Sequence, residues 1–181
     1  MEYREPVNYK ENTCSFSGIR PAMADLPYPP IRVRGENMHY ADLLSMDYCG
    51  PVSELSAITQ YINNENRLAL ADCALAKTLL GIAIAEMMHL QKLGELICLL
   101  GKPVDFQSRG CGGKQRLWTP DYLTIPGKAS QMLAADIESE QEAISQYKMH
   151  MREIRDEGVN AVLQRIILDE EYHIMLLESL R

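Results

Sequence analysis

The sequence lacks several features that indicate a nucleic-acid-binding, secreted or membrane-spanning protein. It has no excess of basic residues, since 18 Lys and Arg stand against 25 Asp and Glu and the net charge is −7. This balance argues against binding to nucleic acid or to an anionic membrane surface. No basic start followed by an apolar stretch marks a signal peptide, and each apolar run is far shorter than the roughly 18–20 residues of a bilayer span. We therefore expect a cytoplasmic protein with neither nucleic-acid nor membrane partners.

Paired cysteines are also lacking. The five cysteines are odd in number, widely spaced and include no C-x-x-C pair. Cys73 and Cys98 lie in apolar helical sequence, where a buried free thiol is the ordinary interpretation. Cys111 lies in the glycine-rich stretch "RGCGGK", for which we expect a mobile, exposed loop without a redox role.

The 181 residues, 46% of them apolar, are enough for one well-packed domain. Residues 1–36 carry five of the nine prolines and show no sustained periodicity. We therefore predict an irregular N-terminal strap over residues 1–37 and a helical domain over residues 38–181.

Helical spacing begins near residue 38, with Gly50-Pro51 marking a kink or a restart. A second helix is predicted from the N-cap Asp72 to Leu100, where Gly101 follows. After a long Gly- and Pro-rich connection, a third helix is predicted over 129–155, "DEGVN" forms a turn, and a fourth helix runs from residue 160 nearly to the end. This order predicts an all-α, antiparallel four-helix bundle with a long crossover between the second and third helices.

The two halves of the helical region resemble one another. "ELSAITQY" at 54–61 matches "EQEAISQY" at 140–147, and a Glu-x-x-His motif occurs at 86–89 and again at 170–173. The chain is therefore interpreted as a duplicated helical hairpin.

Each hairpin places polar residues on a face that is otherwise apolar. Glu86 and His89 lie on the apolar seam of the second helix, because residues three apart share a helix face. Four carboxylates at one level of an apolar bundle would cost several kcal/mol each if ionised and unpaired. Two divalent cations would neutralise them, and carboxylate with imidazole is a ligand set for iron, manganese or zinc. The predicted metal ligands are Glu54, Glu86, His89, Glu140, Glu170 and His173.

At these residues the sequence resembles the ferritin-like superfamily, which includes rubrerythrins, bacterioferritins and manganese catalases, among them the catalase-like spore-coat proteins. The resemblance covers roughly residues 40–180. It implies a dinuclear iron or manganese centre in which Glu86 and Glu170 bridge the metals. Glu54 and Glu140 would then be terminal ligands, and His89 and His173 would each bind one metal.

The resemblance also suggests roles for residues around the ligands. Tyr61 and Tyr147 look like hydrogen-bond donors to the metal-binding carboxylates, although core aromatics are the alternative. Many relatives have Asp before each Glu-x-x-His to orient the histidine of the opposite helix. Asp169 fits that role toward His89, but Ala85 occupies the other place. Without cysteine pairs for a rubredoxin-like iron site, a full rubrerythrin is excluded.

The implied function is a dinuclear metal oxidoreductase with two iron or two manganese ions. It would act on hydrogen peroxide or oxygen as a catalase, peroxidase or ferroxidase, with an unknown electron donor. The alternatives are iron storage, as in ferritins, and a structural, spore-coat-like bundle with an idle site.

Three further expectations concern residues outside this set. A third Glu-x-x-His, Glu36 to His39, has no matching repeat and is interpreted as surface structure. His150 has no Glu partner at helical spacing, so we expect it at the surface or an interface. The second helix is apolar beyond its seam, and the crossover, the strap or a second subunit must cover it. A homodimer is the preferred prediction.

Overall fold

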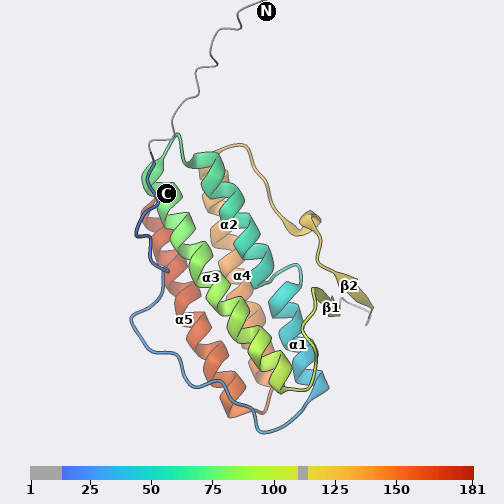
Figure 1. The fold of residues 1–181 in the computed structure, drawn as a ribbon. Coiled ribbons are helices and arrows are strands. Elements are labelled where there is room, and N and C mark those ends of the chain that lie inside the picture. The colour runs from blue at the N-terminus through green and yellow to red at the C-terminus, as the bar shows by residue number, and fades with distance from the viewer. Residues whose placement is uncertain (1–13, 110–113) are drawn as a thin grey trace, which may run out of the picture.

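The computed structural model describes residues 14–109 and 114–181, and its architecture is a bundle of long antiparallel helices (Figure 1). The predicted all-α fold class is confirmed. The helices are α1 (Met38–Cys49), α2 (Glu54–Leu68), α3 (Cys73–Leu99), α4 (Ala129–Glu153) and α5 (Glu157–Ser179). The break between α1 and α2 falls at Gly50-Pro51, so the predicted kink or restart is a restart. Both helices pack beside α3, one after the other along the bundle.

Side-chain caps fix where the helices begin. Asp72 accepts a hydrogen bond from the backbone N–H of Leu75 and caps α3, as predicted. Asp156 accepts from the backbone N–H groups of Gly158 and Val159, so α5 begins at Glu157. The prediction that "DEGVN" forms a turn and that the helix starts at residue 160 was therefore wrong, because the first residue of that stretch is itself the cap.

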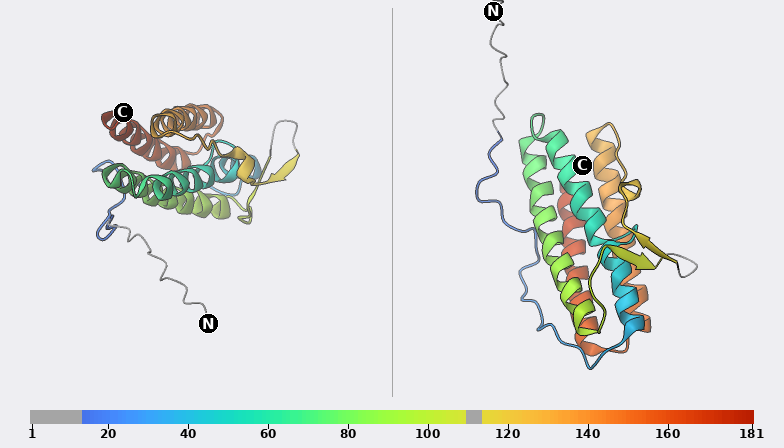
Figure 2. Two further views of the ribbon diagram at one scale, coloured as in Figure 1. Left: turned by 90° about the horizontal axis from the view of Figure 1, so that it is seen from above. Right: turned by 45° about the vertical axis from the view of Figure 1, so that its right-hand side comes forward.

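The long connection from α3 to α4 returns along the bundle, as the predicted crossover requires (Figures 1 and 2). It contains a two-stranded antiparallel sheet of β1 (Gln107–Arg109) and β2 (Gln115–Leu117), which the sequence analysis did not anticipate. A short 3-10 helix, Pro120–Tyr122, follows. Cys111, for which we predicted an exposed loop, lies outside the described residues.

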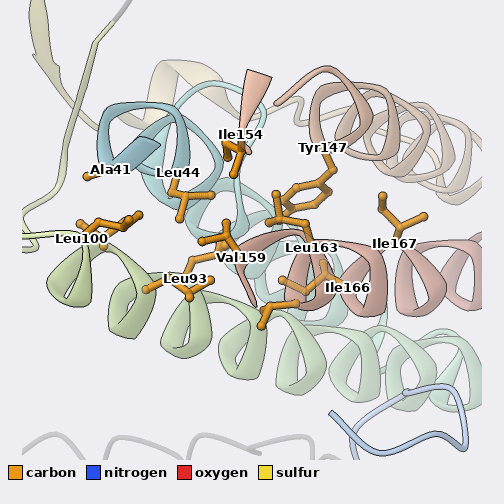
Figure 3. Close-up of a cluster of buried hydrophobic side chains, with 13 residues drawn as sticks. Ala41, Leu44, Leu93, Leu100, Tyr147, Ile154, Val159, Leu163, Ile166 and Ile167 are labelled. Carbon is orange, nitrogen blue, oxygen red and sulfur yellow. The ribbon is translucent and has the colours of Figure 1, made fainter. Parts of the chain in front are cut away.

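Two apolar clusters fill the bundle, one toward each end. The first includes Leu44, Leu93 and Leu163 (Figure 3), and the second includes Leu79 and Leu133. Along α3 and α5 the Glu-x-x-His motifs lie between the two clusters. The polar residues therefore form a layer with apolar packing on both sides.

Helix α3 is long and apolar enough to cross a membrane by length and composition, with a mean hydropathy of 1.4 over its best window. A helix of this length and hydropathy was not expected from the short apolar runs of the sequence. Half of that window is buried inside the bundle, and Ile82, Glu86 and His89 face the interior. Because the core helix of a bundle passes the same test, the finding is weak evidence for a membrane span. Met87 and Leu99 remain exposed on the outer side of α3.

Residues 14–37, called the strap below, are extended along α3 and α5 (Figures 1 and 2). A disulfide joins Cys14 to Cys73 at the start of α3. The prediction of a free thiol at Cys73 was therefore wrong, because its partner comes from an irregular segment 59 positions away, where periodicity gives no signal. The predicted burial of Cys98 was also wrong, since this free cysteine lies on the exposed side of α3.

The other two histidines differ from each other. His39 is exposed, and its Nε2 lies 3.3 Å from Oε2 of Glu153, as expected for surface structure. His150 is buried, and its Nδ1 lies 2.8 Å from Oδ2 of Asp47 on α1. The surface or interface prediction for His150 was wrong, because α1 packs against α4 and supplies a carboxylate that lies 103 positions away in sequence.

Candidate metal centre

The structure brings all six sequence-predicted ligands together at one depth of the bundle. They come from α2, α3, α4 and α5, and each is at most 3% exposed. Nδ1 of His89 lies 3.0 Å from Glu86 and 3.4 Å from Glu170. Nδ1 of His173 lies 3.0 Å from each of the same two carboxylates. The two histidines thus share one pair of acids.

The donor atoms form two overlapping groups. One consists of Glu54, Glu86, His89 and Glu170, and the other of Glu86, Glu140, Glu170 and His173. Within each group the donor atoms lie within 4.8 Å of one another. Glu86 and Glu170 belong to both groups, whereas Glu54 and Glu140 each belong to one. Two ions with two shared carboxylates need this distribution of donors.

Three buried polar atoms at the middle of the layer lie close together but form no hydrogen bond with the described residues. Glu86 Oε1, Glu170 Oε2 and His173 Nδ1 are buried and make no hydrogen bond, yet Nδ1 lies 3.0 Å from both oxygens. Leaving buried polar atoms unpaired is costly. A cation among these atoms would satisfy all three, so the donor set fits a divalent metal pair.

The charges of the metal-free layer are unbalanced in a way that favours bound protons. Burial, together with the charges of Glu170 and Glu86, raises the pKa of Glu140 to about 8. Burial and Glu86 likewise raise the pKa of Glu54 well above its usual range. Burial opposes the charged form of His89, but the surrounding carboxylates outweigh it and raise the His89 pKa. In the absence of cations, protons therefore neutralise part of the layer.

The pKa of the second histidine shifts in the same direction as that of the first. Burial acts to lower the pKa of His173, but Glu140, Glu170 and Glu86 outweigh it and raise that pKa well above 6.5. The pKa of Glu86 falls well below its usual range despite burial, because Glu54 donates a hydrogen bond to it and both imidazoles lie beside it. Glu86 is therefore ionised in the metal-free layer.

Each terminal carboxylate accepts a hydrogen bond from a tyrosine of the opposite hairpin. The hydroxyl of Tyr61 on α2 donates to Oε1 of Glu140, and the hydroxyl of Tyr147 on α4 donates to Oε1 of Glu54. Burial and the charge of Glu140 raise the pKa of Tyr61 well above 10, so its hydroxyl remains a donor. The structure thus places both tyrosines against the acids, crosswise between the repeats.

Asp169 lies where the sequence predicted, behind His89. Its Oδ2 is 3.1 Å from Nε2 of His89, which leaves Nδ1 of the ring toward the carboxylates. Burial acts to raise the pKa of Asp169, but hydrogen bonds from His89, Arg165 and Tyr28 lower it to about 2. The backbone N–H of Ala24 also donates to this carboxylate, at 2.7 Å. Asp169 is thus an ionised, fully bonded partner for His89.

The equivalent partner of His173 comes from the strap. Nε2 of His173 lies 2.7 Å from the backbone carbonyl oxygen of Ala22, and Ala85, in the place of the expected Asp, is fully buried. Sequence reasoning missed Ala22, because a backbone carbonyl has no residue-type signature. It also missed Arg165, although its position four residues before Asp169 is ion-pair spacing on a helix.

A small pocket lies against the layer, between the start of α2 and the middle of α4. Its free space of about 10 Å³ is close to that of a single water molecule. The lining includes the four carboxylates of the layer together with Tyr147 and Gln146. Asp47, the partner of the buried His150, lies on the same wall. The pocket therefore offers a route to the carboxylates that suits a small molecule.

Comparison with known proteins agrees with this geometry. The family model described as "Ferritin-like domain" matches residues 54–181. The chain is 29% identical over 160 residues to a probable manganese catalase of Clostridium acetobutylicum, a match that covers 79% of this chain and 70% of that protein.

Two solved structures share the fold. A manganese catalase from Anabaena superposes with a TM-score of 0.77 at 24% identity, over 87% of this chain and 77% of that one. The bacterioferritin of Rhodobacter capsulatus gives 0.65 at 22% identity, over 80% and 84%. The four-helix architecture with a two-fold Glu and Glu-x-x-His layer defines the class, and the chain belongs to the ferritin-like family.

Proposed function

We propose that this protein is a dinuclear iron or manganese oxidoreductase that acts on hydrogen peroxide or oxygen. The observation that carries the proposal is the pair of overlapping donor groups, in which Glu86 and Glu170 are common to both. Glu54 and His89 complete one position, and Glu140 and His173 complete the other. Two ions held there would supply two-electron redox chemistry through shared oxygen ligands.

The residues of the chain hold this layer in one arrangement. Tyr61 and Tyr147 keep the terminal carboxylates in place through their hydroxyls. Asp169 holds His89 with Nδ1 toward the acids, and the Ala22 carbonyl does the same for His173. These bonds select the neutral tautomer that binds a metal through Nδ1.

The surroundings restrict what can enter. The two apolar clusters exclude water from both ends of the layer, and the small pocket admits a molecule about the size of water. Glu54 and Tyr147 line that pocket, so the proton on the Tyr147 hydroxyl lies beside the entry route. Among possible substrates, hydrogen peroxide and oxygen, with two heavy atoms each, are close to this size, whereas a larger organic substrate is not.

Peroxide dismutation is the specific activity that we favour, because the relative with 29% identity is a probable manganese catalase. Two molecules of hydrogen peroxide give two of water and one of oxygen, and no separate electron donor is required. Iron storage and an idle structural site are the competing proposals. We also propose a cytoplasmic location. A homodimer is proposed as well, and the exposed apolar Met87 and Leu99 on α3 support it.

The test begins with protein purified from its native host, since expression elsewhere can load the wrong metal. We expect about two iron or manganese atoms per chain by elemental analysis, as the two donor groups require, together with oxygen release from hydrogen peroxide. The Glu86→Gln variant should lose both, whereas Glu171→Gln, at an exposed position of α5, should lose neither.

Two results would favour a competing proposal, and a third would count against the metal centre itself. A large shell on size-exclusion chromatography would favour storage over a dimeric enzyme. Full metal content without turnover would favour the idle structural site. Metal-free protein from the native host would contradict a metal centre altogether.

A further inference from the structure

The strap contacts the metal centre at both histidines, although it contains none of the six ligands. Ala22 accepts the hydrogen bond from His173, while Ala24 and Tyr28 donate to Asp169, the partner of His89. The strap therefore lies behind both imidazole rings, on the side away from the carboxylates.

The two histidines depend on the strap to different degrees. The partner of His89 is a carboxylate on α5, and that carboxylate also has a contact outside the strap, with the Arg165 guanidinium at 2.6 Å. The partner of His173 is the strap backbone itself. Displacing the strap would leave Asp169 against His89 but would remove the acceptor from Nε2 of His173.

The attachment of the strap also differs along its length. From Ala24 onward, several contacts attach the strap to the bundle. Arg165 donates hydrogen bonds to the carbonyl oxygens of Ala24 and Leu26, and the Tyr28 ring packs against the cations of Lys92 and Arg165. Before that point, the Ala22 N–H donates to the Gly81 carbonyl, at 2.9 Å. The Cys14–Cys73 disulfide ties the same stretch covalently to α3. Ala22 thus lies between the disulfide and Ala24, with one backbone hydrogen bond of its own to α3.

We propose that the Cys14–Cys73 disulfide controls metal binding at the His173 position by holding the Ala22 carbonyl against Nε2 of that ring. This inference rests on the proposed function, since it assumes that the layer binds metal. Reduction frees the start of the strap, the ring of His173 loses its fixed orientation, and the group of Glu86, Glu140, Glu170 and His173 binds its ion more weakly. The group that contains His89 keeps its affinity.

The chemical step is a thiol–disulfide exchange with a dithiol reductant. The bond between the sulfur atoms of Cys14 and Cys73 breaks, two thiols form, and the dithiol becomes a disulfide, so two electrons and two protons are transferred. Hydrogen peroxide reverses the change: its O–O bond breaks, the two thiols become the disulfide, and two water molecules leave. In a reducing compartment such a bond is typically a redox-responsive one.

The experiment compares Mn²⁺ binding to the full-length chain and to the double variant Cys14→Ser/Cys73→Ser. The double variant Cys49→Ser/Cys98→Ser, at the two described free cysteines, is the matched control. Loss of an outer hydrogen-bond partner typically weakens metal binding about 10- to 100-fold. In the Cys14→Ser/Cys73→Ser variant, called the tether variant below, we expect that loss at the His173 position alone. In the control variant we expect both positions to keep their affinity.

A measurement without metal separates this inference from the proposed function. In the metal-free protein, imidazole NMR should show an Nε2 proton on His173 that exchanges slowly with solvent. In the tether variant that proton should exchange rapidly, while the Nε2 proton of His89 stays protected. If the wild type binds neither Mn²⁺ nor Fe²⁺ but the exchange difference is found, the proposed function fails and the role of the disulfide in holding Ala22 stands.

A rescue variant makes the test sharper. Ala85→Asp, added to the tether variant, places a carboxylate where the resemblance predicts a partner for His173, so it should restore the weakened position. If the serine variant does not fold, reversible reduction of the wild type, with the reductant removed anaerobically, gives the same comparison. Equal weakening of both positions, or none, would overturn the inference.

Discussion

The two hairpins repeat the same ligands but not the same support for them. In each hairpin a Glu-x-x-His motif supplies one shared carboxylate and one imidazole. The tyrosine of each hairpin donates a hydrogen bond to the terminal carboxylate of the other hairpin. The hydrogen-bond partners on the other side of the two imidazole rings differ. His89 has the ionised carboxylate of Asp169, and His173 has the neutral carbonyl of Ala22.

A duplicated site can thus keep its ligands while the hydrogen-bond partner of one histidine comes from another part of the chain. An anionic partner raises the basicity of an imidazole ligand more than a neutral one does. We therefore expect the metal position at His89 to be the tighter of the two.

The largest effect is expected where the two positions share a ligand. Glu86→Gln should weaken binding at both positions by at least about 100-fold, beyond the range typical of outer partners, because Glu86 approaches both histidines. Glu170→Gln should do the same. Equilibrium dialysis against Mn²⁺ measures this, with Glu171→Gln as the exposed control, and loss at one position alone would contradict a shared role.

The dependence on pH should be nearly as large. In the metal-free protein the pKa values of His89 and His173 are raised above 6.5 and that of Glu140 is raised to about 8, so these groups hold protons near neutral pH. A metal ion must displace them, and affinity should therefore rise with pH, by about tenfold per unit for each proton displaced. Calorimetry in buffers of different ionisation enthalpy counts these protons between pH 6 and 8, and binding that weakens as pH rises would oppose this account.

Asp169→Asn should make the two positions more alike. The asparagine offers His89 a neutral carbonyl oxygen, as Ala22 does for His173, so the tighter position should lose about tenfold in affinity. The other position should change little. Competition with a chelator resolves the two affinities, and a larger loss at the His173 position would reverse our assignment.

The smallest effects are expected at the tyrosines. Tyr61→Phe and Tyr147→Phe each remove one donor to a terminal carboxylate, and a hydrogen bond to a charged group contributes roughly 1.5–3 kcal/mol. Because the carboxylates are partly protonated without metal, we expect losses in metal affinity below that range, at about 1 kcal/mol or roughly fivefold. The two variants should act on opposite positions, Tyr61→Phe through Glu140 and Tyr147→Phe through Glu54. Identical effects on one position would break the crosswise arrangement.

Much of the site could be predicted from sequence because its signals are local. Residues three or four apart share a helix face, so Glu86 with His89, and Glu170 with His173, had to lie on apolar seams. His150 could have been assigned by the same rule, since it follows Tyr147 by three residues on the buried face of α4. Its partner, Asp47, could not be assigned, because nothing in the spacing relates α1 to α4.

The helices, their duplicated hairpins and the six donors follow from the sequence, because helical periodicity and charge burial act over a few residues. The partner on the outer side of each histidine depends on how distant parts of the chain fold together. The Ala22 carbonyl lies 151 positions from His173, and the Cys14–Cys73 bond spans 59 positions. A backbone carbonyl is common to all residue types, so only the path of the folded strap could select that one.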